Sequence, residues 1–175
     1  MTRMILKMID LSLMAEHLPV HKAELDKLAS YICTIQDSEI KQAATEQYMM
    51  MQNHVKVMIA LMDPVQNETI SIEDLHKWEP VSFNCQQNSI GMSQENILKE
   101  LATSAKSMAN NNFNSALRMK AENVRTIHTH MALQQMTMLN RYNALLNKFG
   151  KDTAPVSSRK EQEETMETFQ KMFNL

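Results

Sequence analysis

Histidine and glutamate are the residues of this chain best suited to bind a metal ion, so their spacing is the first guide to its chemistry. The 175 residues contain a single Glu-x-x-His sequence, Glu73 to His76. A dinuclear iron site in a helical bundle requires two such motifs and two further glutamates on facing helices. This segment has no partner motif, and its pattern is typical of a short capped helix. His128 and His130 are two positions apart and point to different sides of a helix, which predicts ordinary surface or boundary histidines.

Cysteine and serine offer no recognisable nucleophile. Cys33 and Cys85 are too few and too widely spaced for a zinc site or a disulfide framework, so we expect two reduced thiols, with Cys33 filling space in the core. No serine stands in a recognisable catalytic setting. The run from Met49 to Met51 continues an apolar helix face, which favours core packing over soft-metal binding. The sequence therefore predicts no catalytic, cofactor-binding or metal-binding residues.

Composition narrows the fold to one that is mostly helical. Hydrophobic residues make up 43% of the chain, which has only two glycines and four prolines. These are too few for the tight turns of a β-sandwich or barrel. The formal net charge of -2 gives no general attraction for nucleic acid. Lys7, Asp10 and Glu16 interrupt the apolar N-terminal stretch, and no segment is apolar enough to span a bilayer. We expect cytoplasmic synthesis, without nucleic acid or membrane as a partner.

Apolar residues at three- and four-residue spacing predict four long helices in two hairpins. The first hairpin covers residues 4–62 and turns at Asp37, and Pro19 either kinks its first helix or divides it. Residues 63–92 lack the helical periodicity and form a crossover. Residues 93–150 form the second hairpin.

The two hairpins repeat one another at an offset of 84 residues without a gap. The matching positions include three pairs: Lys22 and Lys106, Ile40 and Val124, and Leu61 and Leu145. We expect both leucines of the last pair in the core. A helix of about 25 residues is about 37 Å long, a distance that the crossover can travel. Residues 1–150 are therefore predicted to form one all-α domain, a four-helix bundle of two repeated hairpins in the ferritin-like order.

A metal site of the ferritin-like kind is not expected at the middle of this bundle. Counting outward from the two turns places Met50, Met108 and Gln134 at that level, with Glu24 as the one carboxylate. Thioether and amide groups are poor ligands for iron. The required carboxylate and histidine ligands are missing from these positions.

Each hairpin also carries a lysine in its first helix, an acidic cluster at the turn, and then a hydrophobic and basic pair that opens the second helix. The segments are Lys22 with residues 37–41 and Lys106 with residues 122–125, and the last helix closes with residues 144–150. In these features residues 10–150 resemble the spore coat F-type proteins of endospore-forming bacteria, whose domain is a ferritin-like helical bundle. The resemblance implies a structural or assembly role in the spore coat, with no catalytic residues. It also implies other coat proteins as partners.

A linker and a short amphipathic helix follow the bundle, over residues 151–175. Ser158 and Glu161 match a capping box, and the helix that they open carries four apolar residues on one face: Met166, Phe169, Met172 and Phe173. A helix of about fifteen residues is marginal alone in water, so we expect this face to cover another surface. Its own bundle, a second copy of the protein in a homodimer and a different coat component are the three candidates.

Three functions stay open on the sequence. The leading hypothesis is a non-enzymatic structural or assembly protein of the spore coat that acts through protein–protein contacts. The alternatives are a ferritin-like metal-binding protein or enzyme with an unrecognised site, and a helical adaptor or regulatory module unrelated to sporulation.

Overall fold

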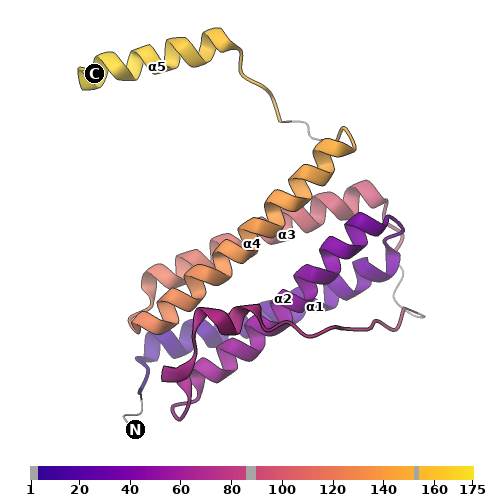
Figure 1. Ribbon diagram of the computed structural model, residues 1–175, viewed down its shortest axis with the longest axis vertical. Helices are drawn as coiled ribbons and strands as arrows, with labels where there is room; N and C mark the ends of the chain where they lie inside the picture. The colour runs from indigo at the N-terminus through magenta and orange to yellow at the C-terminus, as the bar shows by residue number, and fades with distance from the viewer. Residues whose placement is uncertain (1–3, 86–89, 152–153) are drawn as a thin grey trace.

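The fold is all-α, as the composition and periodicity predict. The computed structural model describes residues 4–85, 90–151 and 154–175, and these contain helices and no strand. The elements in chain order are α1 (Met8–Thr34), α2 (Ser38–Met62), the 3-10 helices η1 (Asn67–Thr69) and η2 (Ile72–His76), α3 (Gln94–Arg118), α4 (Glu122–Lys148) and α5 (Arg159–Phe173). Helices α1 to α4 pack as a bundle, and α5 lies beyond the end of α4, apart from the bundle (Figure 1). No helix in the described ranges is long and apolar enough to cross a membrane.

The bundle consists of two antiparallel hairpins joined by one long connection. Helices α1 and α2 form the first hairpin and α3 and α4 the second. The start of α3 lies beside the turn between α1 and α2, where the Gln94 side chain accepts a hydrogen bond from the Gln36 N–H at 2.8 Å. The connection between the hairpins therefore returns along the whole length of the bundle. On the way, Leu75 of η2 is fully buried in the core.

The 84-residue repeat predicted from the sequence reappears in the contacts between the hairpins. Asp10 of α1 accepts hydrogen bonds from the Lys120 and Ala121 N–H groups, at 2.6 and 3.3 Å, where α4 begins. Gln94 of α3 accepts hydrogen bonds from the backbone N–H groups of the two residues before α2, Gln36 at 2.8 Å and Asp37 at 3.5 Å. Positions 10, 120 and 121 are each related by 84 to positions 94, 36 and 37. The first helix of each hairpin thus caps the second helix of the other.

The core consists of two apolar clusters, one toward each end of the bundle. Leu61 and Leu145, the pair predicted from the repeat to be core residues, are both buried, one in each cluster. Helix α1 is one continuous helix through Pro19, so the proline does not divide it. Met8 and Phe113 share the helical spacing of the apolar faces, but both are exposed.

The two cysteines form a disulfide, so the expectation of two reduced thiols is wrong. The Cα atoms of Cys33 and Cys85 are 5.1 Å apart, although 52 residues separate them in sequence. The returning connection brings Cys85 beside the end of α1. Near this point the Ile90 N–H donates a hydrogen bond of 3.0 Å to the Thr34 hydroxyl.

Candidate functional site

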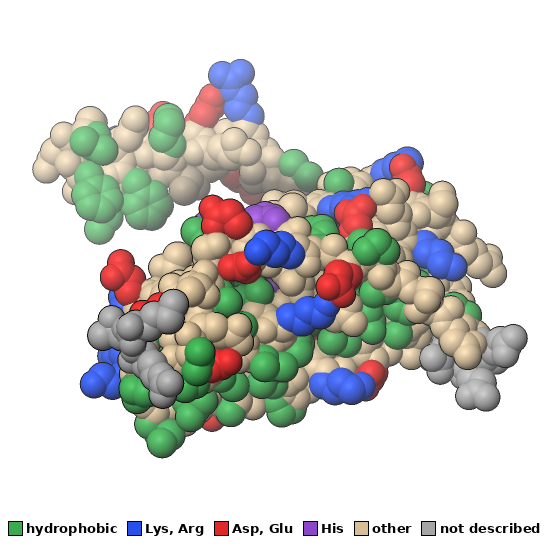
Figure 2. All heavy atoms as spheres, turned by 60° about the horizontal axis from the view of Figure 1, so that its bottom comes forward, with side chains coloured by type: hydrophobic (Ala, Val, Ile, Leu, Met, Phe, Trp, Pro, Cys, Tyr) green, Lys and Arg blue, Asp and Glu red, His purple; other side chains and the backbone are tan. Residues whose placement is uncertain are grey.

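The apolar face predicted for the C-terminal helix is present and uncovered. Ser158 and Glu161 form the predicted capping box at the start of α5, and no residue of α5 is buried. Met166, Phe169, Met172 and Phe173 are between 52% and 70% exposed. Figure 2 shows apolar side chains gathered along one side of this separate helix. Docking on its own bundle, one of the three destinations considered from the sequence, is therefore not observed.

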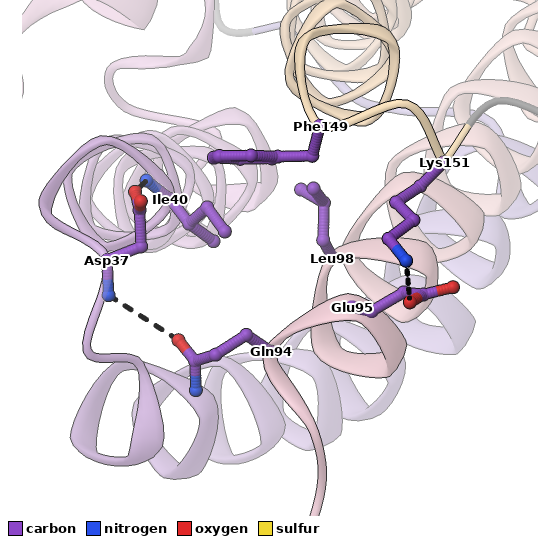
Figure 3. Close-up of a pocket in the computed structure, with 7 residues that line it drawn as sticks. All are labelled: Asp37, Ile40, Gln94, Glu95, Leu98, Phe149 and Lys151. Atoms are coloured by element: carbon purple, nitrogen blue, oxygen red, sulfur yellow. Dashed lines mark hydrogen bonds and ion pairs between the residues drawn. The ribbon is translucent and has the colours of Figure 1, made fainter.

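A cavity of about 350 Å³ opens at the end of the bundle from which the linker to α5 departs. Figure 3 shows the side chains of Ile40, Leu98 and Phe149 meeting around it, one each from α2 and α3 and from the end of α4. Its rim is polar. Lys151 forms an ion pair of 2.9 Å with Glu95 there. The cavity therefore combines an apolar lining with a charged rim.

Four histidines from three helices gather in the core, and we call them the histidine cluster: His17 and His21 on α1, His54 on α2 and His128 on α4. The His17 ring centre is 5.7 Å from that of His128 and 6.2 Å from that of His21, and His21 is 6.0 Å from His54. His21, His54 and His128 have no solvent exposure. On α1 and α2 the cluster lies where the two apolar clusters of the core meet.

Three of these rings each use one nitrogen in a hydrogen bond that fixes the proton there. The Nδ1–H of His21 donates to the His17 carbonyl at 3.0 Å, and the Nδ1–H of His128 donates to the Val124 carbonyl at 2.9 Å. The Nε2–H of His54 donates to Gln134 Oε1 at 2.7 Å. Gln134 is held in this orientation because its side-chain Nε2–H donates to the Leu75 carbonyl at 3.1 Å. Each neutral ring therefore keeps a lone pair on its other nitrogen.

The free lone pairs of the cluster have no hydrogen-bond partner. They belong to Nε2 of His21, Nδ1 of His54 and Nε2 of His128. Nδ1 of His17 is likewise unpartnered, while its Nε2 shares a hydrogen bond of 2.7 Å with the Ser115 hydroxyl. Buried polar atoms without partners are uncommon in proteins because each costs about 1 to 3 kcal/mol.

Burial keeps these histidines neutral near pH 7. It lowers the pKa of His21 and His128 to about 4 and that of His54 to about 3, from an ordinary value of 6.5, and it also lowers the pKa of His17. The neighbouring histidines lower the pKa values of His21, His54 and His128 further. Glu24 opposes the shift at His21 and Asp10 opposes it at His128.

A second polar group in the core lies on α2 and α4. The Tyr142 hydroxyl donates to Gln47 Oε1 at 2.7 Å, and the Gln47 amide donates to Gln135 Oε1 at 3.0 Å. All three side chains are fully buried. Burial raises the pKa of the Tyr142 hydroxyl, so it stays protonated as the donor. The side chains of this group are joined to one another by hydrogen bonds, whereas the rings of the histidine cluster are not.

The sequence did not reveal the histidine cluster. His128 was expected at the surface or a boundary, but it is completely buried because α4 turns it toward α1. His130 is half-buried. One local signal was available in the spacing of His17 and His21, four residues apart, which places two rings on one helix face. Their approach to His54 and His128 depends on the packing of the hairpins.

The side chains as they stand do not surround a common point. Within the described ranges, no group of three or more His, Cys, Asp or Glu residues is arranged to hold a metal ion. No protein-family model, curated protein or solved structure matches this chain.

Proposed function

We propose that this protein is a non-enzymatic structural protein that assembles with a second copy of itself through α5, and that it is a component of the bacterial spore coat. The observation that carries the proposal is the apolar face of α5, which no described residue of its own chain buries. A helix of about fifteen residues gains little stability by itself in water. Covering Met166, Phe169, Met172 and Phe173 supplies the missing stabilisation, since each large apolar side chain contributes about 1.5 to 3 kcal/mol when fully buried.

The cavity at the bundle end is the surface that best suits this face. Its lining of Ile40, Leu98 and Phe149 is apolar, and its volume of about 350 Å³ accommodates an aromatic side chain. Phe169 and Phe173 are the aromatic residues that α5 presents. An apolar anchor in a pocket with a polar rim is a common form of helix recognition. In this arrangement each copy contributes α5 to its neighbour and receives a helix in return.

The spore-coat setting is supported by the resemblance of residues 10–150 to the spore coat F-type proteins. The connectivity of α1 to α4, two hairpins with one long crossover, favours the ferritin-like assignment that accompanies this resemblance. A structural role also agrees with the position of α5, which lies apart from the bundle (Figure 1) and can contact another copy of the protein.

Light scattering coupled to size-exclusion chromatography tests the assembly. The full chain is expected to associate with increasing concentration, whereas the double variant Phe169→Ser and Phe173→Ser stays monomeric with an unchanged melting temperature. The double variant Glu164→Ser and Glu167→Ser, on the opposite face of α5, is the matched control and retains association. A full chain that stays monomeric at every concentration, or association that survives loss of the phenylalanines, would overturn this role for α5.

Substitution of the cavity tests the receiving surface separately. Phe149→Ser removes a half-exposed side chain from its edge and is expected to weaken association without affecting α5. If association is unchanged, α5 binds elsewhere on its neighbour.

The time of expression tests the coat assignment. Expression during sporulation, with recovery of the protein in purified coats, is expected. Expression confined to growing cells would contradict it and would favour a helical adaptor unrelated to sporulation.

A further inference from the structure

We propose that the histidine cluster binds one divalent transition-metal ion of the zinc type, through the ring nitrogens of His17, His21, His54 and His128 that have no hydrogen-bond partner. Imidazole nitrogen suits zinc and its neighbours in the first transition series. Such a site is independent of the assembly proposed for α5.

The internal repeat shows that the fold does not require histidine at these positions. Shifting the four positions by 84 residues leads to the other end of the bundle. The corresponding residues there are Leu101 for His17, Ala105 for His21, Met138 for His54 and Ala44 for His128. All four are buried in the apolar core. The same packing environment is therefore filled by apolar side chains in one half and by four histidines in the other.

The hydrogen bonds of the cluster prepare the rings for a metal ion. A histidine that binds a metal usually donates its other ring N–H to a carbonyl or carboxylate, which fixes the tautomer. His21 and His128 donate to backbone carbonyls and His54 to the Gln134 side chain. Their remaining nitrogens carry lone pairs and no proton, the form that a metal ion requires.

Neighbouring rings along the series His128, His17, His21 and His54 are spaced nearly as in a bound site. His17 and His21, four residues apart on α1, provide the helical pair used in many zinc sites. Two imidazoles that bind one tetrahedral zinc ion have ring centres roughly 5 Å apart, as follows from Zn–N distances of about 2.0 to 2.1 Å. The observed separations of 5.7 to 6.2 Å are slightly larger. No group of side chains within the described ranges is arranged to hold an ion, but inward movement of these neighbouring rings by about 1 Å closes most of the difference.

Access and charge also favour a cation. A cavity of about 290 Å³ reaches two rings of the cluster, His17 and His21, and its charged lining residues are Glu16 and Arg118. Glu24, three residues after His21, has a buried Oε2 atom without a hydrogen-bond partner. These carboxylates, with Asp10 near His128, offset the charge that a divalent ion brings among neutral ligands.

Metal titration of the full chain, stripped with chelator at pH 7.5, tests the proposal. Zn²⁺ is followed by calorimetry and Co²⁺ by its visible absorption, and each is expected to bind at one ion per chain and to raise the melting temperature. His54→Met and His17→Leu place at each site the residue found at the matching repeat position. Each is expected to weaken Zn²⁺ binding by at least about a hundredfold. His76→Ala, at an exposed histidine of η2, is the matched control and leaves binding unchanged.

Circular dichroism confirms that the variants fold, and X-ray absorption of the wild-type zinc complex gives a readout that needs no variant. It is expected to show three or four imidazole ligands. Fewer than three would overturn the proposal. The proposal also fails if neither ion binds at one per chain, in which case buried water alone satisfies the ring nitrogens. It fails equally if both cluster variants retain wild-type affinity or if His76→Ala abolishes binding.

Discussion

Replacing Asp10 is expected to destabilise the protein more than replacing any local helix cap. Asp10 is fully buried in α1, and its carboxylate accepts hydrogen bonds from the Lys120 and Ala121 N–H groups at the start of α4. Helix α4 has no cap of its own, since the residue at its N-cap position is Ala121. The carboxylate therefore satisfies backbone donors at the positive end of the α4 dipole from a different hairpin.

The expected cost of Asp10→Ala is about 3 kcal/mol. Hydrogen bonds to a charged group contribute about 1.5 to 3 kcal/mol, and the helix dipole adds about 0.3 to 1 kcal/mol. Asp10→Asn keeps one acceptor oxygen and the side-chain volume, so it is expected to cost about half as much. Gln94→Ala removes the repeat-related contact, which is neutral and half-buried, and is expected to cost about 1 kcal/mol.

Urea unfolding followed by circular dichroism measures these differences, with an unchanged slope showing that only stability has altered. Ala121→Ser in the Asp10→Ala background supplies a local cap for α4 and is expected to recover about 1 kcal/mol. If Asp10→Ala costs no more than Gln94→Ala, the capping of α4 by α1 does not stabilise the fold.

Three further perturbations have expected outcomes. Leu61→Ala and Leu145→Ala are each expected to cost about 2 to 5 kcal/mol in urea unfolding, and a nearly neutral result for either would mean that the repeat register is wrong. In metal-free protein the lowered pKa values of the histidine cluster predict acid lability. The contribution of these neutral histidines to stability is complete above pH 6.5, the pKa of histidine in the unfolded chain, and is lost as the pH falls toward 4. It is lost because the unfolded chain binds protons in this range while the folded chain does not. Between pH 7.5 and pH 5 this amounts to about 2 kcal/mol for each of the three fully buried rings, and unfolding free energies that are flat over this range would contradict it. Reduction of the Cys33–Cys85 disulfide, which closes a loop across 52 residues, is expected to lower the free energy of unfolding by about 2 to 4 kcal/mol. Urea unfolding measures this loss, and the double variant Cys33→Ser and Cys85→Ser, which cannot form the bond, is the comparison.

Most of the fold was predictable from local sequence patterns. The helices follow from apolar spacing with the helical period, and the capping box at Ser158 follows from two residues three positions apart. The disulfide between Cys33 and Cys85 was not predictable in this way, because it depends on the path of a long connection. The same limitation applies to His128. Its helix was predicted, but the side of α4 that faces α1 was set by packing.

The repeat separates the parts of the core that the fold needs from the part that it does not. Leu61 and Leu145 match across the two halves, as do the cap contacts of Asp10 and Gln94, and both sets of contacts hold the hairpins together. The histidine cluster breaks this correspondence, since the other half buries only apolar residues at the same positions. Four rings with buried, unpartnered nitrogens reduce stability when nothing binds them. A bound cation explains why such a group stands in one half of a bundle whose other half packs without it.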